Sequence, residues 1–296
     1  MVDARTRVCA LLGHPVGHSL SPAMQNAAFR VVGINAVYVA LDVFPGALRD
    51  ALQGMRAMGF LGANITIPHK EAVMGLVDRL DGGAVAAGAI NTVVLRNDEL
   101  IGYNTDGEGF LRSLAEAGVD PAGMQVLIIG AGGAAKAVTL ALARAGVRNM
   151  VITNRTTERA EELAGLARLR GVQAGVLPWK DVEEASFSGQ KAFGAAELII
   201  QTTSLGMNPK ADAGPPVPAA WFSRGQVVYD LVYNPVYTVF LAKARSAGAR
   251  VVSGLGMLLH QGAASFELWT GVSAPLEAMR SALEAEIKKR GLAGSA

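Results

Sequence analysis

Short apolar runs alternate with longer mixed stretches along the whole chain, the pattern of strands connected by helices. In the first half, the strands expected from this pattern are Val8–Leu12, Ala36–Leu41 and Leu61–Ile67, and the helices are Pro22–Val32, Ala47–Met58 and Lys70–Val77. A second series of expected strands comprises Met124–Ile129, Val151–Thr153, Leu198–Thr202, Val227–Leu231 and Arg250–Ser253. Because alternating strands and helices build parallel sheets with right-handed crossovers, the sequence predicts an α/β protein.

The two series are separated by a segment with a different pattern. Asn91–Leu95 and Leu100–Tyr103 are predicted to form a hairpin or paired edge strands, and a helix over Glu108–Ala117 then leads to the second series. Two helices close the chain, at about Gly256–Leu268 and Pro275–Lys289. A chain of 296 residues suits two compact domains. We expect the division near residue 107, with the last two helices free to return to the first domain.

Composition and charge exclude several classes of protein. The chain is 51% hydrophobic with a mean hydropathy of +0.30, yet no stretch is apolar over the length that a membrane span needs. With 27 basic and 25 acidic residues intermixed, the sequence gives no sign of a nucleic-acid partner. The first residues lack the layout of a signal peptide, and the single cysteine, Cys9, excludes an internal disulfide. We expect a cytoplasmic enzyme that binds small molecules, without a metal.

A glycine-rich turn follows the first strand of the second series. Met124–Ile129 runs directly into Gly130-Ala131-Gly132-Gly133-Ala134-Ala135, and a helix is expected to follow. This is the strand–turn–helix setting in which a dinucleotide pyrophosphate binds at a helix N-terminus. A purely structural turn is the alternative interpretation.

The end of the next strand favours NADP over NAD. Asn154 lies 154 − 130 = 24 residues after the first glycine, where NAD enzymes usually carry an acid for the ribose hydroxyl. Here that position is neutral, and Arg155 and Arg159 lie beside it. Arginine binds phosphate through two parallel hydrogen bonds, although both arginines could instead be solvated helix residues.

Four polar islands interrupt the apolar background of the first half, at Gly13–Pro22, Asn64–Lys70, Gly88–Thr92 and Gly102–Gly107. In the second island, Asn64 and Thr66 emerge on one face of a strand and Lys70 follows its end. Polar groups at this end of a buried strand line the ligand-binding edge of an α/β fold, where a lysine can carry a proton.

Two residues of the other islands have a structural alternative. Ser21, followed by Pro22, suggests a helix N-cap and first helical position, although neutral hydroxyls at a helix N-terminus also suit a carboxylate ligand. Asp106 could likewise cap the helix that follows it.

Together these islands and the glycine-rich turn resemble the shikimate dehydrogenase family. The resemblance continues at Asn154–Thr156, Asp230–Pro235 and Gly254–Gln261, so it spans nearly the whole chain. It implies an N-terminal α/β substrate domain with a mostly parallel sheet, formed by residues 1–106 and 254–296, and an NADP-binding Rossmann domain at 107–253.

The family's site residues carry over to matching positions. The resemblance implies that Ser19 and Ser21 hold a substrate carboxylate. The residues that it assigns to the ring hydroxyls are Asn64, Thr66, Asn91, Asp106 and Gln261, with Tyr233 nearby, while Lys70 and Asp106 form the catalytic pair at the substrate. The cofactor residues that it implies are Gly130, Ala131, Gly132, Gly133, Ala134, Asn154, Arg155, Thr156, Arg159 and Thr203, with Gly254 and Met257 near the nicotinamide.

This chain departs from the family pattern at two places that bear on the structure. Gln25 stands where the family often has histidine, and we expect it to affect the helix surface more than the chemistry. Gln201-Thr202 replaces the usual Asn-Ala in a stretch that lines the cofactor side of the family's fold.

The implied reaction is reversible hydride transfer between NADPH and the C3 carbonyl of 3-dehydroshikimate, giving shikimate in the chorismate and aromatic amino acid pathway. Lys70 is the expected proton donor, although burial would lower its pKa and Asp106 would raise it, and the sequence leaves the outcome open. Within the family, a quinate/shikimate or aminoshikimate dehydrogenase is the alternative. A non-catalytic NADP(H)-binding sensor and a methylenetetrahydrofolate dehydrogenase are the alternatives outside it. Monomer and homodimer both remain open.

Overall fold

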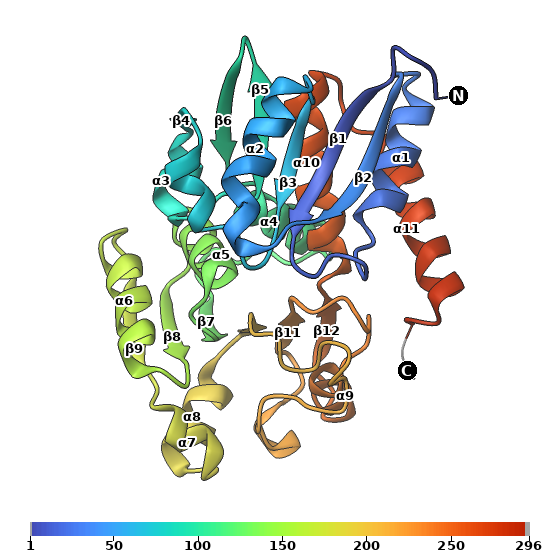
Figure 1. Cartoon of the computed structure of the whole chain (residues 1–296). Coiled ribbons are helices and arrows are strands. Elements are labelled where there is room, and N and C mark those ends of the chain that lie inside the picture. The colour runs from blue at the N-terminus through green and yellow to red at the C-terminus, as the bar shows by residue number, and fades with distance from the viewer. Residues whose placement is uncertain (1, 294–296) are drawn as a thin grey trace. The chain divides into compact units, whose positions relative to one another are not determined.

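A computed structural model describes residues 2–293, in which the chain forms two compact units (Figure 1). The first unit comprises the chain up to Gly109 together with Leu258–Arg290, and the second comprises Phe110–Met257 and residues 291–293. Each unit contains a six-stranded sheet with helices packed against it. The predicted α/β class with two mostly parallel sheets is confirmed.

The sheet of the first unit has the strand order β2-β1-β3-β5-β6-β4. Its strands are β1 (Arg7–Gly13), β2 (Ala36–Asp42), β3 (Gly62–Ile65), β4 (Arg79–Leu80), β5 (Thr92–Arg96) and β6 (Glu99–Tyr103). β1 lies parallel to β2 and β3, whereas β5 is antiparallel to both of its neighbours. The hairpin predicted from the sequence is therefore β5–β6.

Helices cover both faces of this sheet. They are α1 (Ser21–Val31), α2 (Leu48–Ala57), α3 (Gly82–Ala87) and α11 (Leu276–Arg290), with the 3-10 turns η1 (Pro45–Ala47) and η2 (Ala72–Leu76). Two further helices, α4 (Asp106–Glu116) and α10 (Leu255–Thr270), each begin in one unit and end in the other. Because side chains alternate along a strand, Ala63 and Ile65 of β3 join the apolar cluster under α2, while Asn64 contacts Ser265 of α10.

The sheet of the second unit is parallel throughout, with the order β12-β11-β10-β7-β8-β9. Its strands are β7 (Gln125–Ile129), β8 (Asn149–Thr153), β9 (Gln173–Val176), β10 (Leu198–Gln201), β11 (Val227–Asp230) and β12 (Arg250–Ser253). The connecting helices are α5 (Gly133–Arg144), α6 (Thr157–Arg168), α7 (Trp179–Glu183), α8 (Phe187–Ala195) and α9 (Val239–Ser246), with the turn η3 (Ala219–Trp221). The strand order reverses between β7 and β10, which places the ligand crevice of a doubly wound sheet at their carboxyl ends.

The helix predicted over Lys70–Val77 is wrong, since only the 3-10 turn η2 forms there. The backbone carbonyl of Lys70 accepts a hydrogen bond from the N–H of Ile90 at 2.8 Å, while the N–H of Met74 bonds to Glu71. The carbonyl that would start an α-helix is thus used to join Lys70 to the next segment of the unit. This contact fixes the backbone of the lysine.

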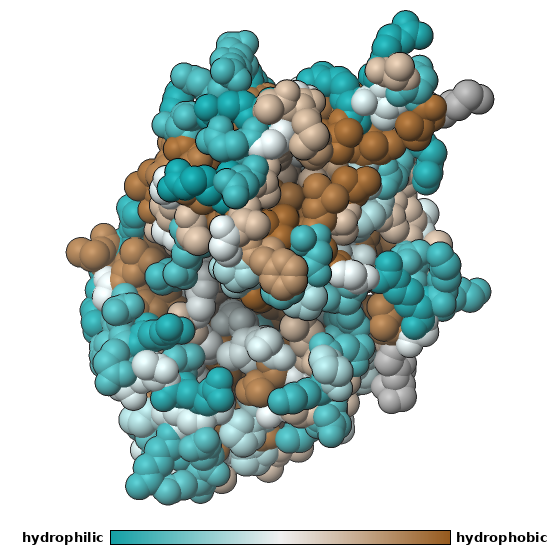
Figure 2. Space-filling view, viewed as in Figure 1, coloured by the Kyte–Doolittle hydropathy of each residue, from teal (hydrophilic) through white to brown (hydrophobic). Residues whose placement is uncertain are grey.

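Apolar and polar residues are interspersed on the face seen in Figure 2, and hydrophobic residues are most evident over β1 and β2. Val39 and Leu41, on the edge strand β2, are 36% and 39% exposed. Within residues 2–293, no helix has the length and apolar character needed to cross a membrane.

Candidate functional site

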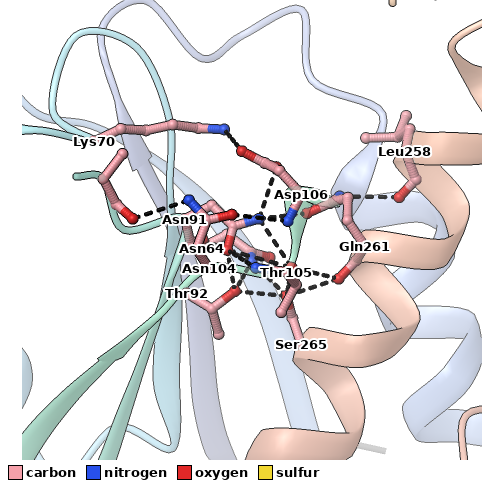
Figure 3. A network of polar contacts seen from close by, with 11 residues as sticks. Asn64, Lys70, Asn91, Thr92, Asn104, Thr105, Asp106, Leu258, Gln261 and Ser265 are labelled. Atoms are coloured by element: carbon pink, nitrogen blue, oxygen red, sulfur yellow. Dashed lines mark hydrogen bonds and ion pairs between the residues drawn. The ribbon is translucent and has the colours of Figure 1, made fainter. Parts of the chain in front are cut away.

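Lys70 and Asp106 lie together in the first unit, where the lysine ammonium points at the carboxylate (Figure 3). Lys70 Nζ donates to Asp106 Oδ2 at 2.6 Å. The Asp106 side chain is 6% exposed and that of Lys70 is 23% exposed. The carboxylate is therefore buried, whereas the ammonium it holds remains within reach of solvent or a ligand.

The start of α4 orients Asp106. Its backbone N–H donates to the side chain of Asn104 at 3.0 Å, so Asn104 satisfies one of the free donors at the helix N-terminus. The other carboxylate oxygen, Oδ1, accepts from Asn91 Nδ2 at 2.8 Å. Lys70 and Asn91 thus each hold one oxygen of the Asp106 carboxylate.

Asn91 connects this pair to α10. Its Nδ2 also lies 2.9 Å from Thr105 Oγ1 and 3.3 Å from Gln261 Oε1, and its Oδ1 accepts from the N–H of Thr105 at 2.8 Å. Gln261 is itself oriented by donating to the carbonyl of Leu258 at 2.9 Å. The side chains of Lys70, Asp106, Asn91 and Gln261 therefore form one hydrogen-bonded chain.

Asn64 belongs to the same network from the side of β3. Tyr38 OH donates to Asn64 Oδ1 at 2.8 Å, and Asn64 Nδ2 lies 2.9 Å from Ser265 Oγ and 3.2 Å from Thr92 Oγ1. The sequence interpretation missed the parts played by Tyr38, Thr92 and Ser265. Ser265 lies four residues after Gln261 and hence on the same face of α10, which is the signal that could have found it.

Three hydroxyl-bearing residues of the prediction lie outside this network. Ser19 and Ser21 are buried next to the start of α1, and Thr66 is half-buried after β3. Ser19 Oγ accepts from the N–H of Ser21 at 3.2 Å. Among residues 2–293, the hydroxyls of Ser21 and Thr66 have no hydrogen-bond partner, so both are available to a ligand.

The prediction that Ser21 is the helix N-cap is wrong. Helix α1 begins at Ser21, and its N-cap is Leu20, whose side chain makes no capping hydrogen bond. Leu20 has a helical backbone conformation, so the turn that precedes Ser21 already leads into the helix. Since the Ser21 hydroxyl does not cap the helix, it remains available to donate to a ligand.

The prediction that Gln25 affects the helix surface is also wrong, because its side chain is fully buried. Gln25 Nε2 donates to the carbonyl of Gly262 at 2.8 Å, which ties α1 to α10. A Cβ at position 262 would lie 2.3 Å from the Met24 Cε atom, so the two helices pack closely here. Gln25 therefore links α1 to α10 at the position next to Gln261.

In the second unit, the glycine-rich turn links β7 to α5. Gly130 has φ +109°, and a Cβ there would lie 2.4 Å from Thr202 Oγ1, so only glycine fits. At Gly132, the N-cap of α5, a Cβ would have no atom of a described residue within 4 Å apart from those of its neighbours in the chain. Among residues 2–293, no side chain caps α5, and its first turn carries no acid. The uncapped N–H groups at the start of α5 and the space beside Gly132 suit a pyrophosphate.

The end of β8 carries the other predicted cofactor residues. Asn154 Nδ2 donates to the carbonyl of Thr156 at 2.9 Å, and Thr156 is the N-cap of α6. Arg155 and Arg159 are exposed, and neither has a carboxylate partner within the described chain. Two unpaired guanidinium groups at a helix N-terminus fit the additional phosphate of NADP.

The remaining predicted residues lie at the carboxyl ends of β10, β11 and β12. The hydroxyl of Thr203 accepts from the N–H of Leu205 at 3.1 Å. A Cβ at Gly254 would lie 2.2 Å from the carbonyl oxygen of Leu231. Met257 is buried in the apolar core of this unit, and Tyr233 is half-buried.

The structure brings Asn64, Lys70, Asn91, Asp106 and Gln261 together in the first unit, as Figure 3 shows. It places the turn at Gly130 and the loop after β10 together in the second. Each set lies within one unit. The roles of these residues, and those of Tyr233, Gly254 and Met257 toward a ligand, stay predictions.

Comparison with known families accounts for most of the chain. A model described as the shikimate dehydrogenase substrate binding domain matches residues 11–93. A model of shikimate/quinate 5-dehydrogenase matches residues 113–204, and one of the shikimate 5'-dehydrogenase C-terminal domain matches residues 254–284.

Similar solved structures include enzymes that are named for different substrates. A crystal structure of a shikimate dehydrogenase in complex with NADP⁺ has a TM-score of 0.88 at 41% identity, covering 97% of this chain and 98% of its own. One from Thermus thermophilus with NADP(H) and shikimate has a TM-score of 0.82 at 38% identity, covering 95% and 99%. A quinate dehydrogenase from Corynebacterium glutamicum in complex with NAD has a TM-score of 0.84 at 30% identity, covering 95% and 99%.

Among curated relatives, a Moorella thermoacetica protein named shikimate dehydrogenase (NADP(+)) is 55% identical over 279 residues. The match covers 94% of this chain and 92% of the relative. On the strength of these family models and this relative, the chain belongs to the shikimate dehydrogenase family.

Proposed function

We propose that this protein catalyses the reversible, NADP(H)-dependent interconversion of 3-dehydroshikimate and shikimate, a step toward chorismate and the aromatic amino acids. The observation that carries the proposal is the ion pair between Lys70 and the buried Asp106, held in place by Asn91. A part-exposed ammonium beside a buried carboxylate suits proton transfer at a ligand oxygen. The relatives named as NADP-dependent shikimate dehydrogenases support the choice of substrate and cofactor.

The substrate carries one carboxylate and several ring hydroxyls, and the first unit offers groups of matching chemistry. The free hydroxyl of Ser21, together with that of Ser19, suits the carboxylate, because both lie by the N-terminus of α1. Thr66, whose hydroxyl has no partner in the described part of the chain, contributes a donor for the ring. Asn64, Asn91 and Gln261 contribute amide groups from the network, and Tyr233 of the second unit is the remaining candidate.

Lys70 performs the proton transfer in this mechanism. When NADPH is bound, the cofactor supplies the hydride that adds to the C3 carbonyl carbon. Negative charge then develops on the C3 oxygen, and Lys70 Nζ donates a proton to it, giving the alcohol. Asp106 keeps the ammonium oriented at 2.6 Å, and the part-exposed amine regains its proton from solvent. In the oxidative direction, the neutral amine of Lys70 accepts the alcohol proton.

The second unit holds the cofactor in this proposal. The residues that we assign to the pyrophosphate are Gly130, Ala131 and Gly132 of the turn and Gly133 and Ala134 of α5, because uncapped N–H groups at the start of this helix favour an anion. The residues that we assign to the adenosine phosphate are Asn154, Arg155, Thr156 and Arg159. Thr203, Gly254 and Met257 are the candidates for the nicotinamide end.

Steady-state kinetics with shikimate and quinate, each with NADP⁺ and NAD⁺, tests the proposal. We expect the largest kcat/KM for shikimate with NADP⁺. A larger kcat/KM for quinate would replace the substrate and place the protein with the quinate dehydrogenases. Cofactor binding without turnover of either compound would favour a non-catalytic sensor. We further propose a cytoplasmic location and a monomer or homodimer, and light scattering would distinguish the two assembly states.

A further inference from the structure

A buried glutamine ends β10 and organises the loop that follows. Gln201 is fully buried. Its Nε2 donates to the carbonyl of Leu205 at 3.0 Å and to Asp230 Oδ1 at 3.1 Å, while its Oε1 accepts from the N–H of Thr203. The loop over 202–206 is therefore wrapped around this one side chain.

Asp230 extends the arrangement to the neighbouring strand β11. It is fully buried, and its Oδ1 also accepts from the N–H of Val232 at 3.0 Å. Its Oδ2 accepts from Thr238 Oγ1 at 2.6 Å, and Thr238 caps α9. Asp230 thus joins the loop after β10, through Gln201, to the loop between β11 and α9.

The loop after β10 lies directly against the glycine-rich turn. Both the N–H and the hydroxyl of Thr202 donate to the carbonyl of Ile129 at 2.8 Å. A Cβ at Gly130 would lie 2.4 Å from Thr202 Oγ1 and 2.8 Å from Thr203 Cγ2. Because β10 and β7 are adjacent where the strand order reverses, this loop forms one wall of the dinucleotide crevice.

We propose that Gln201 and Asp230 are positioning residues for the dinucleotide site. They hold the loop over 202–206 against the turn at Gly130, so that this side of the dinucleotide site is already ordered before NADP(H) binds. This inference rests on the proposed function, since it takes NADP(H) as the ligand of the turn. A loop that is already ordered loses less conformational freedom when the ligand binds, and affinity rises accordingly.

The same unit contains a matched control. Gln226 is buried just before β11, where its Nε2 donates to the carbonyls of Phe193 and Ala196 and its Oε1 accepts from the N–H of Ser223. It therefore makes as many hydrogen bonds as Gln201, with a backbone carbonyl in place of Asp230, at the opposite end of the parallel sheet. Gln201→Met and Gln226→Met each remove three buried hydrogen bonds while nearly conserving volume.

The experiment measures the Kd of NADP⁺ by calorimetry and the stability of each variant by urea denaturation. We expect Gln201→Met to raise Kd about tenfold, which corresponds to about 1.4 kcal/mol. We expect Gln226→Met to lose similar stability while its Kd stays within about twofold of the wild type. Equal Kd values for the wild type and Gln201→Met would overturn the inference.

Asp230 gives an independent test through a conservative variant. Asn at position 230 can still accept from Gln201 and Val232 and can donate to Thr238, whereas Ala can do neither. Asp230→Asn should therefore keep the wild-type Kd for NADP⁺, and Asp230→Ala should raise it about tenfold, again about 1.4 kcal/mol. An unchanged Kd in Asp230→Ala counts against the inference, and if that variant does not fold, the comparison of the two glutamines decides.

The outcomes separate this inference from the proposed function. A wild-type protein that oxidises shikimate with NADP⁺, together with variants of unchanged Kd, refutes the positioning role alone. A wild-type protein that does not bind NADP⁺ refutes the cofactor assignment and the inference with it.

Discussion

Raising the pH should destabilise the second unit through Asp230. The carboxyl group is fully buried, and burial raises its pKa from the usual 3.8 to about 7. The hydrogen bonds from Thr238, Val232 and Gln201 act in the opposite direction, because they favour the charged form, but they offset only part of the effect. The folded protein therefore holds a proton that the unfolded chain releases.

The sign and size of the effect follow from this difference. Below about pH 4 the group is protonated in both states, and above about pH 7 it is ionised in both. Between these values only the folded state binds the proton, so the free energy of unfolding falls as pH rises. A shift of 7 − 3.8 = 3.2 units, at 1.36 kcal/mol per unit, gives a total loss of about 4 kcal/mol.

Urea denaturation of the wild type and of Asp230→Asn, in steps from about pH 4 to about pH 8, isolates this contribution. The variant cannot titrate at position 230, while every other ionisable group is shared and cancels in the difference. We expect the stability of the wild type relative to the variant to fall steadily up to about pH 7 and then level off. A difference that stays constant across this range would refute the reasoning.

Three further predictions concern the site. Lys70→Ala should lower kcat by a factor of about 10² to 10⁴ while leaving shikimate binding largely intact, because it removes the proton donor; normal turnover of a variant shown to be folded by circular dichroism contradicts the role. Arg155→Ala and Arg159→Ala should each raise the Kd of NADP⁺ about tenfold or more, through lost charge-assisted hydrogen bonds. NAD⁺ serves as the control ligand, since its binding should not change, and parallel losses for both cofactors would argue against a phosphate contact. Gly130→Ala should lower the affinity for NADP⁺ and the free energy of unfolding, because position 130 has φ +109° and no room for a Cβ. The strained backbone alone should lower the free energy of unfolding by about 2 kcal/mol. An unchanged Tm in a thermal melt would contradict this.

The regular elements could be predicted from the sequence because their signals are local. Apolar runs mark the long strands, and the glycine-rich turn lies where a strand meets a helix, at the start of α5. Strand β4, with two residues, and strand β9, whose residues alternate between exposed and half-buried, have no such signal, so the sequence does not predict them. Helix α3, with six residues, is too short for a helical period to emerge.

Features that depend on distant partners could not be predicted. Gln25 appears as an ordinary polar residue in its own helix, and its burial depends on Gly262, 237 residues away. Likewise, the missing helix after Lys70 depends on a hydrogen bond to Ile90 that no local pattern reveals. Lys70 and Asp106 were predicted as a pair only through the family resemblance, and the structure brings their side chains to 2.6 Å.

The hydrogen-bonding groups of the polar network favour one kind of ligand. Asn64 and Asn91 each have two amide hydrogens, yet six acceptor atoms lie within hydrogen-bond range of their nitrogens. Three of these acceptors are the hydroxyls of Thr92, Thr105 and Ser265, which can also donate. The Gln261 oxygen cannot donate and, at 3.3 Å, is the most distant of the six. A ligand O–H can donate to this oxygen, whereas a second carboxylate in this position would add acceptors beside Asp106 and be repelled.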